Sequence, residues 1–188
     1  MYNRWKNVII YKTFIDNIFY LCYIKKGEKM YKKIVKLIIV LMCMITIFSF
    51  SSDNNQESDK KSDGVIINIT SVLLGHKLSE KEKSDYTSRY VVLVRKGAHY
   101  IIYMILGTSL ISFIKEYRQI DLKALLIALL IAVLYACSDE IHQLFVKGRS
   151  GEITDILLDG VGSFTGIYIY YIINKIRSKK YEQKKAIS

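Results

Sequence analysis

The sequence predicts an all-α membrane protein, a bundle of about four transmembrane helices. Of its 188 residues, 51% are hydrophobic, and the chain contains no proline. The apolar residues gather into four blocks, at residues 37–50, 98–114, 124–136 and 156–173. A bilayer core needs ~20 mostly apolar residues per helix. The alternative, a soluble protein with buried helices, is disfavoured because 188 residues could not cover four such blocks.

Each block becomes long enough to cross a bilayer when its polar edges are included. The second block reaches this length if Lys96 and His99 belong to the helix, and the third if the helix continues through residues 139–143 to Val146. We therefore expect spans at about residues 34–50, 96–114, 124–146 and 155–174. Residues 51–90 are polar and charged, and they predict an extracytoplasmic loop with room for one interfacial helix.

Residues 1–29 differ from the rest of the chain. The stretch VIIYKTFIDNIFYLCYI is apolar but interrupted by Lys12 and Asp16. Gly-Glu-Lys directly before Met30 is what a bacterial ribosome-binding site, GGAGAA, would encode if it were translated. We expect Met30 to be the true start and residues 1–29 to be an extension from a mis-assigned start. An amphipathic interfacial segment or a fifth span is the alternative. A start at Met30 also resembles a secretory signal, and we favour an uncleaved anchor.

The net charge of +11 is distributed as expected for a membrane protein rather than a nucleic-acid-binding protein. Basic residues cluster at residues 25–36, 115–123 and 175–185, which the positive-inside rule places in the cytoplasm. Both termini are then cytoplasmic, and residues 175–188 form a basic tail that attracts anionic lipid. The three cysteines show neither disulfide nor metal-binding spacing, so no metal or other cofactor is expected.

With this topology, the polar groups of three spans lie at the extracytoplasmic end of the bundle. Helix geometry places Arg95 and His99 on one face, and Asp155 and Asp159 on one stripe of the last span. The G-x-x-x-G pattern that starts at Gly162 on the same stripe allows another helix to approach closely. A charge at mid-bilayer costs at least ~2.5 kcal/mol and tends to be paired. The candidate site comprises Arg95, His99, Glu140, Gln143, Arg149, Asp155 and Asp159.

Other ionisable groups near the ends of the spans have simpler interpretations. We interpret Lys96, Lys147 and Glu152 as side chains that reach the bilayer interface or form ion pairs there. For His142, a role in the site and a position at the interface are both open. A purely structural set of ion pairs between spans is the main alternative to a binding site.

The stretches VRKGAHYIIYMILG and YACSDEIHQLFVKGRSGEITDILLDGVGSFTG resemble the VanZ-like family of bacterial integral membrane proteins, over about residues 34–174. The motifs that carry the resemblance are R-K-x-A-H, D-E-x-H-Q-x-F, G-R and D-x-x-x-(N/D)-x-x-G. The resemblance makes residues 30–174 a VanZ-like membrane domain in the bacterial plasma membrane. It also implies a role in the cell envelope and a link to resistance to teicoplanin-type glycopeptides. The chain departs from the family pattern at Lys147, where proline is frequent, and at Asp159, where asparagine is frequent.

Three functions are compatible with these residues. In the first, the protein binds an anionic envelope ligand: a lipid head group, a cell-wall precursor or a glycopeptide. Arg95 and Arg149 would clamp the anion, since guanidinium groups match carboxylate and phosphate, and Glu140, Gln143 and Asp155 would orient the arginines.

The second function is an enzyme that hydrolyses or transfers a lipid-linked phosphate or ester at the outer leaflet. His99 or Glu140 would be the general base, and Asp155 with Asp159 would hold Mg²⁺. The third, a proton-coupled transporter using Asp159 and His99, would require a homo-oligomer. Whether the chain is an enzyme stays open at this point.

Overall fold

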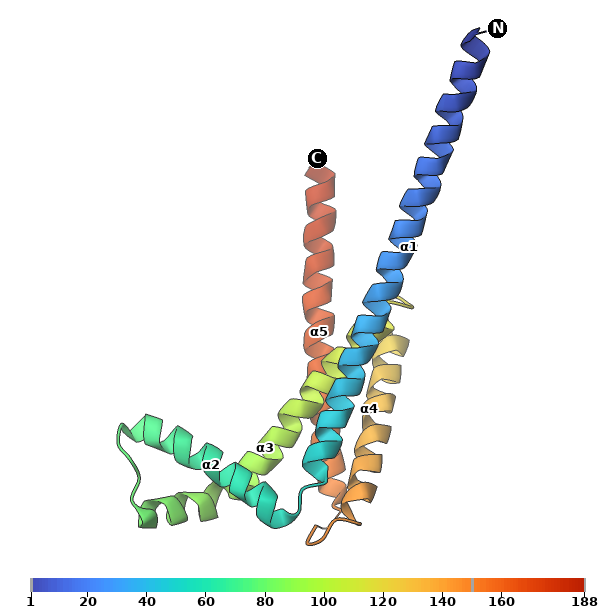
Figure 1. Cartoon of the computed structure of the whole chain (residues 1–188). Coiled ribbons are helices and arrows are strands. Elements are labelled where there is room, and N and C mark those ends of the chain that lie inside the picture. The colour runs from blue at the N-terminus through green and yellow to red at the C-terminus, as the bar shows by residue number, and fades with distance from the viewer. Residues whose placement is uncertain (1, 150, 188) are drawn as a thin grey trace. The chain divides into compact units, whose positions relative to one another are not determined.

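The computed structural model is all-helical in the part of the chain that it describes, which confirms the predicted fold class (Figure 1). It describes the backbone of residues 2–149 and 151–187, and the side chains of residues 27–54, 56–149 and 151–186. The helices are α1 (Tyr2–Ser51), α2 (Asn55–Leu74), α3 (Glu80–Ile114), α4 (Leu122–Gln143) and α5 (Ile153–Ile187).

The chain divides into two compact units, Met1–Ile38 and Ile39–Ser188. The first unit is the beginning of α1. The prediction that residues 1–29 are an extension falls mostly on residues 1–26, whose side chains lie outside the described ones. The second unit contains the end of α1 and all of α2 to α5.

In the part of the chain that the structure describes, four helices are long and apolar enough to cross a membrane, in agreement with the predicted number of spans. The helices and the predicted spans have different limits. The second helix begins at Glu80 instead of residue 96, the third ends at Gln143 instead of Val146, and the last continues to Ala186 instead of ending at residue 174. The chain leaves α4 through a series of turns in which Gly148 has a φ of 80°, a conformation that glycine adopts without a steric penalty.

Residues 51–90, expected as a loop with room for one helix, are mostly helical. The Asn54 side chain caps α2 by accepting a hydrogen bond from the Glu57 backbone N–H at 2.9 Å, and Gly75 ends the helix with a φ of 72°. Ser79 and Glu82 then form a capping box that starts α3 sixteen residues before the predicted span. These capping groups therefore stabilise helices within a polar stretch that lacks a long apolar pattern.

The buried face of α4 is a stripe of alanines, which continues into polar side chains at the end of the helix. Four alanines spaced four residues apart are fully buried: Ala124, Ala128, Ala132 and Ala136. Glu140 follows at the same spacing, and it is only 4% exposed. Small side chains let neighbouring helices approach closely. The same face therefore holds the packed core at one end and the candidate site at the other.

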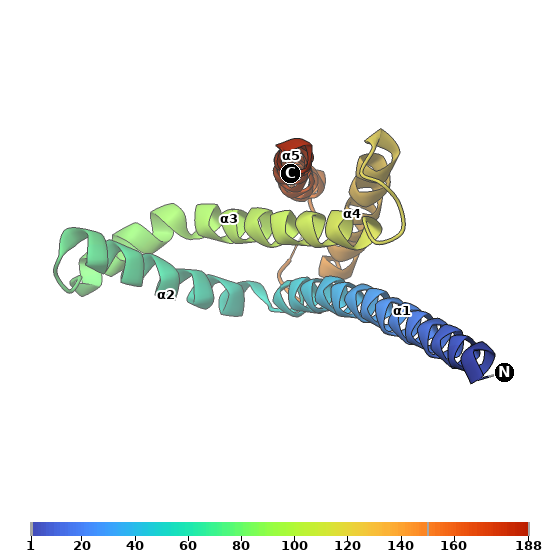
Figure 2. The same cartoon turned by 90° about the horizontal axis from the view of Figure 1, so that it is seen from above.

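Helices α3 and α5 touch through glycines, as the G-x-x-x-G pattern predicted. A methyl group added at Gly162 would lie 2.6 Å from the Tyr100 carbonyl oxygen, and one at Gly166 would overlap the Met104 carbonyl oxygen. Gly107 on α3 is similarly pressed against the Ser163 backbone. Figure 2 shows α3 running between α5 and α2. This contact brings the start of α5 against the middle of α3, where Lys96 and His99 lie.

The end of α1 packs on the same core. The Tyr135 hydroxyl of α4 donates a hydrogen bond to the Met44 carbonyl oxygen at 2.6 Å, and Ile47 is 1% exposed. Ser51, the last residue of α1, is completely buried beside the end of α4. Four helices thus contribute to one polar region.

Candidate functional site

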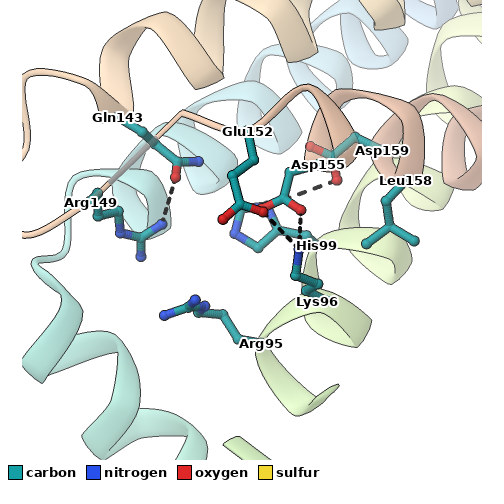
Figure 3. A pocket seen from close by; sticks show the side chains of 9 residues that line it. All are labelled: Arg95, Lys96, His99, Gln143, Arg149, Glu152, Asp155, Leu158 and Asp159. Atoms are coloured by element: carbon teal, nitrogen blue, oxygen red, sulfur yellow. Dashed lines mark hydrogen bonds and ion pairs between the residues drawn. The ribbon is translucent and has the colours of Figure 1, made fainter. Parts of the chain in front are cut away.

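A small polar cavity of about 60 Å³ lies where α3, the end of α4 and the start of α5 meet (Figure 3). Six of the seven predicted site residues line it, and Glu140 does not. The residues that line this polar cavity are Arg95, Lys96, His99, Gln143, Arg149, Glu152, Asp155, Leu158 and Asp159. The structure therefore brings together residues from three separate stretches of the chain. Their function remains a prediction.

Lys96 is part of the cavity rather than a side chain that reaches away to the interface. Its ammonium group forms ion pairs with Asp155 and, at 3.4 Å, with Glu152. The side chains of Lys96 and Asp155 are 34% and 28% exposed, so this pair is partly desolvated. Of the two possibilities for Lys96 and Glu152, the structure shows pairing: Lys96 of α3 meets Asp155 of α5 and Glu152 just before that helix. The sequence does not identify these partners, because they depend on the approach of α5 to α3.

We expect Lys96→Gln and Asp155→Asn each to destabilise the purified protein by about 1–2 kcal/mol. This value lies between the ~0.2–1 kcal/mol of exposed ion pairs and the ~3–5 kcal/mol cost of breaking a buried one. The double variant should lose less than the sum of the single variants, since both changes remove the same interaction. Denaturation of all four proteins in the same detergent measures this coupling. Strictly additive losses would contradict the ion pair.

Glu140 supports the turn after α4 instead of facing the cavity. Its carboxylate accepts hydrogen bonds from the Glu152 backbone N–H at 2.9 Å and from the Gln143 side chain at 3.2 Å. These contacts tie the end of α4 to the start of α5. Glu140 therefore holds the loop that carries Arg149 and acts on the cavity only through its neighbours.

Arg149 enters the cavity from the loop between α4 and α5 and is held by neutral groups. Its guanidinium donates to the Asp53 carbonyl oxygen at 2.9 Å, to the Gln143 side-chain oxygen at 3.1 Å and to the Phe50 carbonyl oxygen at 3.3 Å. No described carboxylate lies within ion-pair distance of this guanidinium. Burial and, to a smaller extent, the nearby Arg95 lower the pKa of Arg149. An arginine nevertheless stays protonated in proteins, so a positive charge is retained in the cavity.

Arg95 points toward α2 and makes one long ion pair, 3.4 Å from the Asp59 carboxylate. That carboxylate is 46% exposed, so solvent screens the pair. The sequence predicts that Glu140, Gln143 and Asp155 orient Arg95. It does not indicate Asp59, because residues 51–90 have the composition of a loop. Figure 3 shows Arg95 and Arg149 on one side of His99, with Asp155 and Asp159 on the other.

Two buried residues that the predicted site did not include contact Gln143, although neither of them lines the cavity. Asp139 is 3% exposed, and one of its carboxylate oxygens accepts a hydrogen bond from the buried Ser51 hydroxyl at 2.7 Å. Its other oxygen is buried without a hydrogen-bond partner among the described residues. One potential ligand atom from each of Asp139, His99 and Asp159 lies within 4.8 Å of the other two. The D-E motif in the sequence contained the signal for Asp139. Nothing in the sequence indicated Ser51.

His142 lies outside the polar cavity. Its ring stacks on Phe48 with centroids 4.4 Å apart, and Nε2 is 3.1 Å from the Ser52 hydroxyl. Phe48 belongs to the end of α1, and Ser52 follows that helix directly. His142 therefore joins α4 to α1.

A larger apolar cavity of about 390 Å³ adjoins the polar one. Side chains from the end of α1, α2 and α3 form most of its wall, including Ile47, Val65, Val94, Ile101, Ile102 and Ile105. Arg95, His99 and Arg149 line both cavities. The two arginines therefore lie where the polar cavity meets the apolar cavity.

One of three comparisons with known proteins gave a match. The VanZ/LLP1 family model matches residues 35–174. This range contains the second and third apolar spans whole, the first span from residue 35 and the last span up to residue 174. It also contains every residue that lines the polar cavity. The searches of curated proteins and of solved structures gave no match. Since the family model covers most of the chain, the chain belongs to the VanZ/LLP1 family.

Proposed function

We propose that the protein binds an anionic amphiphile of the bacterial cell envelope. The acidic head group would lie between Arg95 and Arg149, and the apolar chain would occupy the apolar cavity. The observation that carries this proposal is the state of Arg149: a partly buried guanidinium, adjacent to a second one, with only neutral acceptors among the described residues. A bound phosphate or carboxylate would satisfy both guanidinium groups in bidentate fashion.

The apolar cavity favours a lipid over a water-soluble ligand. A soluble cell-wall fragment would leave about 390 Å³ of apolar space unused, whereas an acyl or prenyl chain would fill part of it. A glycopeptide of the teicoplanin type carries both an acidic group and an acyl chain, so it is a second ligand of the same kind. A contribution to glycopeptide resistance would follow if the protein competes for such a molecule at the membrane.

A binding series with the purified full-length protein tests this function. We would measure phosphatidylglycerol, polyprenyl phosphate, phosphatidylcholine, a soluble muramyl pentapeptide and teicoplanin. We expect the two acidic lipids to bind at least ~10-fold more tightly than phosphatidylcholine. The soluble peptide should bind weakly, because it contributes charge without an apolar chain. Equal affinity for acidic and neutral lipids would contradict the proposal. Preference for the soluble peptide over both acidic lipids would replace the lipid with a cell-wall fragment.

The proposed site faces the outside of the cell, with both termini in the cytoplasm of a multi-pass plasma-membrane protein. The basic clusters after α3 and at the end of α5 support this orientation. In a variant with serine at positions 22, 43 and 137, we expect Lys147→Cys to react with a membrane-impermeant maleimide in intact cells. Lys184→Cys should react only after permeabilisation. The reverse pattern would place the site on the cytoplasmic side.

A membrane enzyme acting on a lipid-linked phosphate or ester is the second candidate function. It is favoured by His99, which lines both cavities and whose Nδ1 has no hydrogen-bond partner among the described residues. Glu140, the other candidate base, is a poor choice because it does not line the cavity. Release of inorganic phosphate from polyprenyl phosphate, lost in His99→Gln, would establish the enzyme.

A further inference from the structure

Three potential metal ligands from three different helices converge beside the polar cavity, which His99 and Asp159 line. They are a ring nitrogen of His99 of α3, a carboxylate oxygen of Asp139 of α4 and one of Asp159 of α5, all within 4.8 Å of one another. Asp139 and Asp159 are 3% and 0% exposed, and the His99 side chain is 16% exposed. Such a group is buried within the protein, unlike an ordinary cluster of surface acids.

The side chains of these three residues carry buried atoms without hydrogen-bond partners. Among the described residues, His99 Nδ1, Asp139 Oδ1 and both carboxylate oxygens of Asp159 are buried without a hydrogen bond. His99 Nδ1 and Asp159 Oδ1 are 4.0 Å apart, too far for a hydrogen bond between them. Burying an unsatisfied polar group costs roughly 1–3 kcal/mol on the scale of mutational data, and an unpaired charge costs more. One potential ligand atom of each residue lies within 4.8 Å of the other two, and a cation placed at that point would satisfy them together.

Neighbouring side chains orient Asp139 toward this point. The Ser51 hydroxyl at 2.7 Å and the Gln143 side-chain amide at 3.4 Å both donate to Asp139 Oδ2. These bonds fix the carboxylate and leave Oδ1 without a hydrogen-bond partner among the described residues. Metal-binding carboxylates are commonly held in this way by outer hydrogen bonds.

We propose that His99, Asp139 and Asp159 bind a divalent first-row transition metal ion, with Zn²⁺ as the best fit. One imidazole nitrogen and two carboxylate oxygens suit zinc, whereas magnesium prefers oxygen ligands and retains its water. Two carboxylates would neutralise the dication inside the protein. Bond lengths of ~2.0–2.2 Å require the three side chains to approach one another by about 1 Å.

The site would leave at least one coordination position open toward the polar cavity, because His99 and Asp159 also line that cavity. Three protein ligands and an open position are typical of zinc sites that bind a further molecule. This inference concerns a different set of residues from the anion site at Arg95 and Arg149. Either proposal can fail without the other.

Metal analysis of the full-length protein tests the site. The protein would be purified in detergent without chelators, analysed by elemental mass spectrometry, stripped with a chelator and titrated with Zn²⁺ against a fluorescent zinc indicator. We expect about one zinc ion per chain. Asp159→Asn and His99→Gln should each weaken Zn²⁺ binding at least ~10-fold, since outer-shell changes alone cost 10–100-fold. Asp85→Asn, the same change at an exposed position of α3, is the control and should leave Zn²⁺ affinity within about twofold of wild type.

A measurement on the wild-type protein tests the same proposal even if the variants fail to fold. Zn²⁺ should raise the unfolding temperature of the stripped wild-type protein, because a ligand that binds only the folded state stabilises it. Mg²⁺ at the same concentration should have a much smaller effect. Absence of bound zinc together with no Zn²⁺-dependent stabilisation would overturn the proposal. Equal loss of zinc in Asp85→Asn and Asp159→Asn, with both variants folded, would also overturn the assignment of the ligands.

Discussion

Gly166→Ala is expected to destabilise the helix bundle by about 1–3 kcal/mol or more and to lower the amount of protein in the membrane. The added methyl group would overlap the Met104 carbonyl oxygen and lie 2.8 Å from the Thr108 hydroxyl. The first of these is a backbone atom, so α3 and α5 would have to separate. Overpacking of an interior typically costs ~1–3 kcal/mol, and a rigid backbone contact leaves little room for relaxation.

Gly160→Ala on the same helix is the matched control. The nearest atom to its added methyl group is a methyl carbon of Val133 at 3.6 Å, an ordinary contact. This change should be neutral or stabilising by up to ~1 kcal/mol, because alanine favours helix more than glycine does. Thermal unfolding in detergent and membrane abundance would be compared. Similar behaviour of the two variants would contradict the close contact of α3 and α5, and with it the position of the polar cavity.

Arg149→Ala is expected to reduce the affinity for an acidic amphiphile by ~30-fold or more. Removing one partner of a buried, hydrogen-bonded charge pair costs ~2–5 kcal/mol, and 1.4 kcal/mol corresponds to tenfold. Arg149→Lys should retain part of the affinity, since it keeps the charge but loses the two-pronged geometry. Lys147→Ala, two residues earlier in the same loop and exposed, is the control and should bind like the wild type.

Arg149 also joins the loop to the end of α1, so its removal could act through structure alone. The affinity for a neutral lipid distinguishes the two effects. A direct role predicts that Arg149→Ala weakens binding of phosphatidylglycerol and leaves binding of phosphatidylcholine unchanged. An equal loss for both lipids would assign Arg149 to the loop structure rather than to the anion.

The sequence predicts the helical spans and the polar end well, for physical reasons that are local. Apolar blocks of span length, a stripe shared by Asp155 and Asp159, and the glycine spacing from Gly162 can all be recognised without tertiary information. These patterns were sufficient to place six residues of the polar cavity together. Glu140 was grouped with them because it shares their helix end, yet its carboxylate turns toward the Glu152 backbone.

The remaining features depend on contacts between distant segments. Ser51 meets Asp139 from 88 residues away, and Asp59 reaches Arg95 only because residues 55–74 form a helix. Lys96 has the sequence context of an interfacial lysine, and the approach of α5 turns it into half of an ion pair. The apolar cavity arises between helices, so no single stretch of sequence encodes it.

The most direct test of the central claim, that one acidic amphiphile occupies both cavities, is photo-crosslinking. Phosphatidylglycerol with a diazirine in its acyl chain would be bound to the full-length protein, irradiated, and the modified residues identified by mass spectrometry. The structure predicts adducts on residues that line the apolar cavity, such as Val65, Ile102 and Ile105, and their loss in Arg149→Ala. Adducts spread evenly over the exposed outer faces, for example on Leu130 and Phe164, and unchanged in Arg149→Ala, would contradict the claim.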